Sequence, residues 1–264
     1  MANNFTNDSN CKALWRFENG ALTTDSKGTN TLTNNNGIVV DTVNFKEGAA
    51  SANFEADSSQ YMSITNANLN AGFPLRSDDT NKIISVCMWI RMESYPTSSI
   101  GREIFAKYNV DSQRCLVIGF SLGTNNGLIG LSVGYNSGTS FESATHGTQL
   151  SLATWYHITT TFNNSDYSYT LRIKDTNGNI IGTDLVGNMT LDVNGISLNT
   201  YALQIGCLSN SGTPLWFYDG LLDECVVFND IITSAEATQI AQGVYGAASG
   251  LIPKAMYHYK YHGG

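Results

Sequence analysis

Charged residues are scarce in this 264-residue chain, where Asp, Glu, Lys and Arg together make up 14% of the sequence. The basic residues form no cluster along the chain, and the formal net charge is −8. Nucleic-acid binding needs basic patches that neutralise phosphates, and anionic membranes attract polybasic segments. The sequence therefore argues against a nucleic-acid partner and against electrostatic attachment to a membrane.

Long apolar runs and an export signal are also missing. No segment approaches the roughly 18 apolar residues of a membrane-spanning helix, so we expect no membrane insertion. The opening MANNFTNDSN has neither the basic nor the apolar region of a secretory signal. Either a signal has been removed, or the protein reaches an extracellular or virion surface by another route, for example within a virus particle.

Paired cysteine motifs are absent as well, since no two of the five cysteines are spaced as CxxC. Cys87 lies in the apolar run ISVCMWI, which predicts a buried, unreactive thiol. Cys207 and Cys225 fall in two expected strands, and the sequence leaves open whether they form a disulfide. The remaining two are Cys11 and Cys115.

Strand-forming segments dominate what is present. Apolar residues make up 42% of the chain, enough for a globular core, and most of them alternate with polar residues at period two. Many short strands separated by Gly-, Asn- and Asp-rich turns predict an all-β sandwich or barrel. The expected strands are residues 59–65, 83–92, 115–122, 128–135, 155–162, 168–174, 180–186, 201–208 and 215–228.

One short helix is expected near the C-terminus. Thr233 and Glu236 have the spacing of a capping box, and Gly243 is a suitable helix stop. Around this frame we expect a flexible leader over residues 1–10, the sandwich over 11–245, and a linker with an aromatic and His-rich tail over 246–264. Residues 251–262 of that tail are candidates for docking on a second copy or on a virion neighbour.

Three segments together resemble one family. They are Ala13–Gly20 with the following Thr24–Asn30, the segment Thr154–Ile158, and DGLLDECVVFN at 219–229 continuing to Glu236. In this order they are similar to the laminin-G-like jelly rolls of the concanavalin A-like lectin/glucanase superfamily. The resemblance implies a two-sheet antiparallel jelly-roll β-sandwich, and small chains of this kind also look like phage structural proteins.

The resemblance also implies one bound ion. Members of the family often hold a structural Ca²⁺ where the opening strand meets the DE segment, and oxygen ligands on loops suit that ion. The alternative is that these side chains only hydrogen-bond to loop amides. The implied ligands are Glu18, Asp25, Asn30 and Asp223.

Signatures of catalysis are missing. The laminarinase branch of the superfamily carries its acids on a strand as E-x-D-x-x-E, and here Glu55 and Asp57 lack the third acid. Asp223 and Glu224 are adjacent, so on an extended strand they would point to opposite faces. There is no G-x-S-x-G nucleophile elbow either. A non-catalytic protein is favoured over a polysaccharide hydrolase or lyase.

Aromatic and polar residues on loops are the candidates for ligand binding. Sugar sites combine a ring that stacks on the saccharide with side chains that hydrogen-bond its hydroxyls. We expect residues 134–147 and 209–218 to be such loops, although each aromatic could instead pack beneath its own loop. The candidates are Tyr135, Asn136, Phe141, Glu142, His146, Trp216 and Tyr218.

The sequence thus predicts a recognition or adhesion module for a glycan or a protein surface, plausible as a virion tail, fibre or decoration component. Two alternatives stay open. One is a polysaccharide hydrolase or lyase, and the other is a subunit that serves assembly alone.

Overall fold

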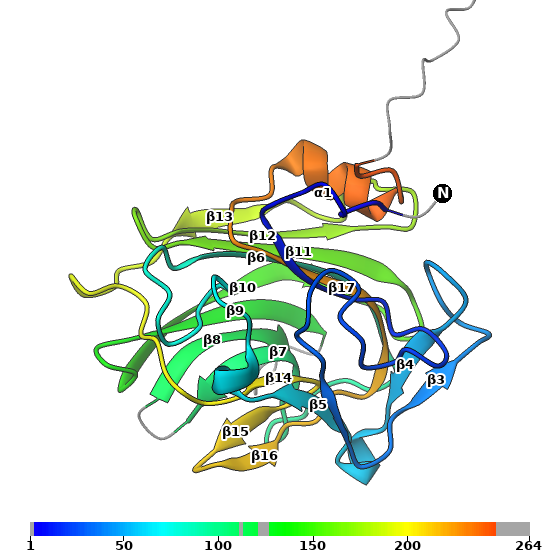
Figure 1. Cartoon of the computed structure of the whole chain (residues 1–264), viewed down its shortest axis with the longest axis horizontal. Helices are drawn as coiled ribbons and strands as arrows, with labels where there is room; N and C mark the ends of the chain where they lie inside the picture. Colours follow the sequence, from blue (N-terminus) through cyan, green and yellow to red (C-terminus); the bar gives the residue numbers. More distant parts are fainter. Residues whose placement is uncertain (1–2, 111–112, 121–126, 247–264) are drawn as a thin grey trace, which may run out of the picture.

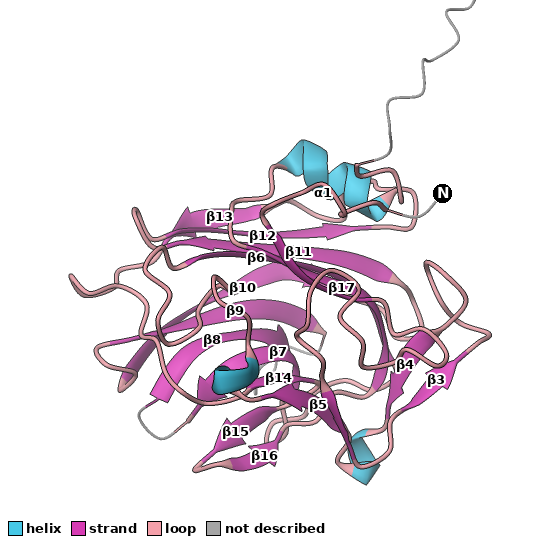
Figure 2. Ribbon diagram, in the orientation of Figure 1, coloured by secondary structure: helices cyan, strands magenta, loops and turns pink. Residues whose placement is uncertain are grey.

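Two antiparallel β-sheets stacked face to face form the body of the molecule, and one α-helix lies outside one of them (Figure 1). The structure is a computed structural model that describes residues 3–110, 113–120 and 127–246. Figure 2 shows that strands and loops account for nearly all of these residues. The predicted all-β, two-sheet sandwich is therefore confirmed.

The first sheet, here called sheet A, has eight strands. They are β1 (Cys11–Trp15), β3 (Val39–Asp41), β4 (Ser51–Phe54), β6 (Ile83–Met92), β11 (Tyr156–Asn163), β12 (Ser168–Lys174), β13 (Leu185–Asn188) and β17 (Gly220–Phe228). Their spatial order is β13-β12-β11-β6-β17-β4-β3, and β1 also pairs with β17.

The second sheet, sheet B, has nine strands. They are β2 (Thr33–Asn35), β5 (Tyr61–Ile64), β7 (Arg102–Asn109), β8 (Gln113–Phe120), β9 (Leu128–Tyr135), β10 (Ser140–Gln149), β14 (Leu203–Ile205), β15 (Leu208–Asn210) and β16 (Thr213–Leu215). Their order is β10-β9-β8-β7-β14-β5-β2, with β15 and β16 forming a hairpin beside β7.

The main core fills the space between the sheets. Alternate residues of each strand point inward, because successive side chains on a strand lie on opposite faces. Leu131 and Val133 of β9 are buried in this way, as are Met88 and Ile90 of β6. Two smaller apolar clusters lie outside the sandwich, one on the outer face of sheet A and one on the outer face of sheet B.

The outer face of sheet A is covered by helix α1 (Ser234–Ala241) and by the N-terminal segment (Figure 1). The predicted capping box is confirmed, because the Thr233 side chain accepts from the Glu236 N–H and the Glu236 carboxylate accepts from the Thr233 N–H. Gly243, with φ of 69°, follows the helix end as predicted. Among the described residues there are also two single 3₁₀ turns, η1 (Ala56–Ser58) and η2 (Asn66–Asn68).

The leader predicted over residues 1–10 differs in the structure from Asn3 onward. Phe5 is 2% exposed and packs against Phe228 and Tyr245. The Asn4 N–H donates to the Tyr245 carbonyl at 2.8 Å. An aromatic side chain at position 5 supplies enough apolar surface to hold the segment on sheet A. The predicted tail lies outside the described residues from 247 onward.

Several predicted elements differ in extent. Residues 134–147, expected as a polar loop, are mostly strand β10, which pairs with β9 along most of its length. The segment 201–208 is divided at Gly206, whose φ is 88°, into β14 and β15. Strand β7 was not predicted at all. No helix in the described part of the chain is long and apolar enough to cross a membrane.

The five cysteines are all buried free thiols. Cys207 lies between β14 and β15, and Cys225 lies in β17 of the other sheet. Both are free thiols, so the disulfide that the sequence left open is not formed. Burial raises the pKa of the Cys87 thiol to about 12, as expected for an unreactive thiol.

Candidate functional site

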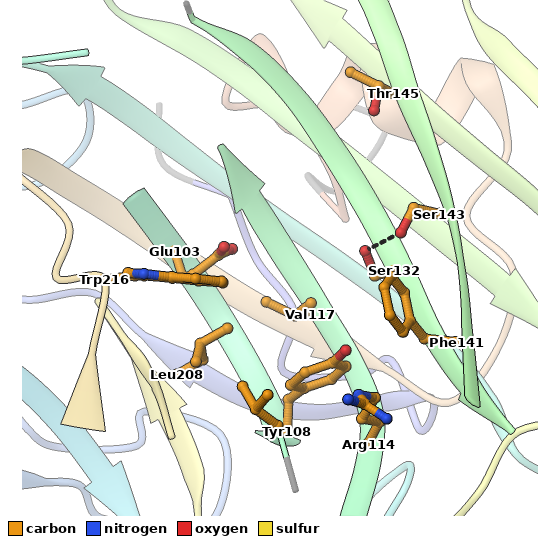
Figure 3. Close-up of a pocket in the computed structure, with 11 residues that line it drawn as sticks. Glu103, Tyr108, Arg114, Val117, Ser132, Phe141, Ser143, Thr145, Leu208 and Trp216 are labelled. Atoms are coloured by element: carbon orange, nitrogen blue, oxygen red, sulfur yellow. Dashed lines mark hydrogen bonds between the residues drawn. The ribbon is translucent and has the colours of Figure 1, made fainter. Parts of the chain in front are cut away.

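A pocket of about 270 Å³ opens on the outer face of sheet B (Figure 3). Its floor is the outer apolar cluster, in which Ala106, Tyr108, Val117 and Leu208 are buried. Strands β7, β8, β9, β10 and β15 all contribute lining residues, and one more comes from the segment that follows β16. The lining residues are Glu103, Tyr108, Val110, Arg114, Val117, Ser132, Phe141, Ser143, Thr145, Leu208 and Trp216.

Strand register places these side chains on one face. Ser132 of β9 pairs with Ser143 of β10 and with Val117 of β8, so the three point the same way. The two serine hydroxyls share a hydrogen bond of 2.6 Å, drawn in Figure 3. Because their neighbours Leu131 and Val133 face the core, the alternation gives the sheet an apolar inner face and a mixed outer one.

Trp216 and Glu103 lie together at one end of the pocket (Figure 3). Trp216 follows β16 with φ of 58°, and its carbonyl accepts from the Glu103 N–H at 2.9 Å. A Cβ added at Gly101 would lie 3.1 Å from the indole Cδ2, so glycine leaves room for the ring. The half-buried indole presents a flat apolar surface, suited to stacking, at the rim of the pocket.

Glu103 is 1% exposed, and its Oε2 has no hydrogen-bond partner among the described residues. A Cβ added at Gly119 would collide with Oε2, so this second glycine provides the space that the carboxyl group occupies. Burial raises the pKa of Glu103 to about 8. The group is therefore mostly an uncharged acid at neutral pH, able both to donate and to accept a hydrogen bond.

Arg114 and Phe141 form the opposite end (Figure 3). The guanidinium carbon of Arg114 lies 5.3 Å from the centre of the Phe141 ring, within cation–π range. Its Nη1 donates to the Thr139 carbonyl at 2.6 Å, while Nε is buried and unpartnered in the described structure. Phe141 is 52% exposed. The pocket thus has a polar atom without a partner at each end and an aromatic ring beside each.

Of the seven predicted ligand-binding residues, the structure brings two into this pocket, Phe141 and Trp216. The prediction of Tyr218 is wrong, because that ring is fully buried and packs edge-on against Phe54 in the core. His146 is also buried, and its Nδ1 accepts from the Thr148 N–H.

The other three predicted residues do not line the pocket either. Tyr135 and Asn136 lie at the β9–β10 turn, where Asn136 has φ of 52°. Glu142 alternates with Phe141 and Ser143 on β10, and its carboxylate accepts from the Thr190 N–H at 2.6 Å.

Sequence reasoning missed Glu103 and Arg114 as pocket residues and placed Tyr108 on a loop rather than a strand. Glu103 and Tyr108 belong to β7, the strand that was not predicted, and Arg114 lies at the start of β8. The pair of glycines at 101 and 119 could have indicated close packing, but only the β7–β8 register shows that Gly119 lies opposite Glu103.

The four residues implied as calcium ligands are divided among three places. Asp25 and Asn30 hydrogen-bond to each other at 2.8 Å, and Asp25 also accepts from the Leu14 and Lys27 amides. Glu18 accepts from the Ala49 N–H. Among the described residues, no group of three or more His, Cys, Asp or Glu side chains is placed to hold a metal ion. The calcium ion stays a prediction.

Asp223 belongs to a row of polar residues across the outer face of sheet A. It pairs in register with Trp89, which pairs with His157, which pairs with Lys174. Asp223 Oδ2 accepts from the Lys46 and Glu47 amides, and burial raises its pKa to about 7. The His157 pKa is lowered to about 3 by burial, so this imidazole is neutral.

Glu224 departs from the expected alternation with Asp223. A bulge interrupts the pairing of β17 with β6 there, and Glu224 has φ of 48°. Its carboxylate forms an ion pair with Arg16 at 2.8 Å. Asp223 and Glu224 are each less than 4% exposed, so neither carboxylate is open to a substrate. The Arg16–Glu224 ion pair is therefore a structural contact.

Two antiparallel sheets packed face to face, with a short helix outside one of them, define the class of jelly-roll β-sandwich domains. The family model described as "Concanavalin A-like lectin/glucanases superfamily" matches residues 56–238. The chain belongs to this superfamily, as the resemblance implied. No curated protein sequence matches it significantly.

Solved structures share the fold at low sequence identity. Domain 4 of AbnA, a GH43 extracellular arabinanase from Geobacillus stearothermophilus, solved with arabinotriose, has a TM-score of 0.59 and 17% identity over 88% of this chain and 98% of its own. The binding domain of Paraclostridial Mosquitocidal Protein 1 has a TM-score of 0.63 and 15% identity over 88% of this chain and 52% of its own. That of botulinum neurotoxin DC, solved with SialylT, gives 0.62 and 11% over 90% and 52%. The chain spans about half of each toxin binding domain.

Proposed function

We propose that this chain is a non-catalytic glycan-recognition module whose ligand binds in the pocket on the outer face of sheet B. The observation that carries the proposal is the pocket itself, in which Trp216 offers a stacking surface beside the unpartnered carboxyl of Glu103. Concave, largely apolar pockets with a few convergent polar groups are the usual form of small-ligand sites. Structures of the same fold include one solved with arabinotriose and one with SialylT.

Catalysis is not favoured by the acids present. Glycoside hydrolysis needs two carboxyl groups, about 5–5.5 Å apart for retention and about 6.5–9.5 Å for inversion. Among the described lining residues, Glu103 is the one carboxylic acid. Tyr108, which a lyase could use as a base, has its pKa raised to about 12 by burial and is not suited to that role near neutral pH.

A glycan array with the wild-type chain and the Trp216→Ala variant tests the proposal. We expect specific binding by the wild type and at least a tenfold loss in the variant, because stacking area worth more than about 1.4 kcal/mol is removed. Phe45→Ala, which removes an exposed ring from a loop outside the pocket, is the matched control and should bind normally.

A blank array with the wild type, or equal binding by wild type and Trp216→Ala, would contradict the proposal. Release of reducing ends or unsaturated sugars from polysaccharides would show catalysis instead.

The biological setting stays a proposal from the sequence. An extracellular or virion surface would suit a glycan-binding module, and a protein surface is the alternative partner. A subunit that serves assembly alone would form ordered oligomers and leave the array blank.

A further inference from the structure

We propose that the ligand of this pocket is an acidic glycan, whose carboxylate binds Arg114 while a sugar ring stacks on Trp216. The inference rests on the proposed glycan-binding function and names the chemical class of ligand for the same site. It concerns the two ends of the pocket, which the figure places on either side of Val117 (Figure 3).

Arg114 is prepared for a planar anion. Its Nη1 is engaged by the Thr139 carbonyl, and the Phe141 ring and the Tyr108 hydroxyl lie beside the guanidinium, so these contacts hold it in place. Its Nε is buried without a partner, and within the described residues no carboxylate forms an ion pair with it. A guanidinium presents a rigid fork of N–H donors that matches a carboxylate, and a buried unpaired donor favours a ligand that satisfies it.

The charge balance of the pocket points the same way. Arg114 is the one basic residue among the described lining residues, and Glu103 is the one acid. Burial keeps Glu103 largely protonated at neutral pH, so it does not cancel the arginine charge. The floor of Tyr108, Val117 and Leu208 is apolar, which strengthens the attraction between a bound carboxylate and the guanidinium.

The net charge of −8 does not oppose this arrangement at short range. Exposed charges farther than about 8 Å away are largely screened at physiological salt, whereas a partly buried pair is screened much less. The acidic surface would slow the encounter with an anionic glycan, while contacts inside the pocket determine how long the glycan stays bound.

Two pairs of probes that differ only in the acidic group test the inference on the full chain. They are oligogalacturonate against its methyl ester, and sialyllactose against lactose, measured by titration calorimetry. We expect at least tenfold tighter binding of the acid in one pair, since a charged hydrogen-bonded contact is gained. The pair that shows the preference identifies the sugar as a hexuronate or a sialate.

Four variants, one of them a control, assign the preference to a residue. Arg114→Gln should reduce affinity for the acid to that of its neutral partner, and Arg114→Lys should retain part of the preference because it keeps the charge without the fork. Arg91→Gln is the control, since Arg91 pairs with Glu93 outside the pocket. Trp216→Ala should weaken acid and neutral probes alike. Thermal unfolding of each variant confirms that it is folded.

The two proposals fail in different ways. Equal affinity for both members of each pair, or a preference that survives in Arg114→Gln, overturns the acidic-glycan inference and leaves glycan binding standing. If none of the four probes and no glycan of a wider neutral array binds the wild type, the proposed function falls, and the inference falls with it.

Discussion

Burial of the Glu103 carboxyl group lowers the stability of the folded state. An acid that is 1% exposed and lacks a partner for one oxygen destabilises the folded state whenever it is ionised. The sequence accommodates it by placing glycine at 101 and 119, where any side chain would crowd the carboxyl or the indole. A leucine in its place would require no such arrangement. Perturbed acids of this kind gather at functional sites, which supports a role for Glu103 in the pocket.

The raised pKa of Glu103 predicts a particular dependence of stability on pH. Its pKa is about 8 in the folded chain against an ordinary value of 4.5, so the folded state binds the proton more tightly. Stability should therefore fall as pH rises from about 4.5 to 8 and level off above that range. The Glu103→Gln variant, measured by thermal unfolding across this range, should show a smaller fall than the wild type.

Glu55→Gln provides the control for this measurement, because Glu55 is exposed and its substitution should leave the wild-type pH profile unchanged. Asp223 and Glu224 also have raised pKa values, and they contribute the same background to every variant. Identical pH profiles for Glu103→Gln and the wild type would show that Glu103 is not the buried acid described here.

At the level of elements, apolar strands were predictable and polar ones were not. The bounds of β6, β9 and β12 match the predicted segments, because β6 is a long apolar run and β9 and β12 are bounded by clear turn sequences. Strand β7 was not predicted because two of its buried residues, Glu103 and Lys107, are charged types and two bulges break its alternation. Lys107 is buried because Asn199 and Tyr201 accept from its ammonium group, partners that lie about ninety residues away.

Strand β10 was predicted as a loop for a different reason. Its sequence SFESATHGTQ is mostly polar, with two serines and two threonines, and as an edge strand it is only partly buried. Edge strands carry weak apolar patterns, so composition alone indicates a loop. Phe141 was therefore predicted as a ligand-binding residue, but its neighbours in the pocket were not. Those neighbours are brought together by the pairing of β7, β8, β9 and β10, which the sequence alone does not reveal.

The cap of helix α1 makes a prediction at this scale. Thr233→Ala removes the side-chain acceptor for the Glu236 N–H, and we expect a loss of about 1 kcal/mol in the free energy of unfolding. Thr238→Ala is the matched control on the same helix, where the hydroxyl only bonds back to the Ser234 carbonyl and its loss should cost little. Urea denaturation measures both. Equal effects would contradict the capping role.

At the scale of the whole molecule, the calcium prediction can be tested by removing the ion. If Glu18, Asp25, Asn30 and Asp223 hold calcium, EDTA should lower the melting temperature and excess calcium should restore it. At a free calcium concentration a hundredfold above the dissociation constant, binding adds about 2.7 kcal/mol to the free energy of unfolding. Glu18→Gln should weaken that response. A melting temperature unaffected by EDTA would contradict a metal role and leave these side chains as the hydrogen-bond partners of amide groups described above.

The hydrogen bond between Asn4 and Tyr245 has a consequence for how the domain is presented. It brings both ends of the sandwich to one spot on the outer face of sheet A, beside α1 (Figure 1), whereas the pocket described above lies on the outer face of sheet B. A domain whose entry and exit are adjacent can be inserted into a loop of another protein with little distortion of the host. If the domain is attached through these adjacent ends, its pocket faces away from the host protein and toward the solvent.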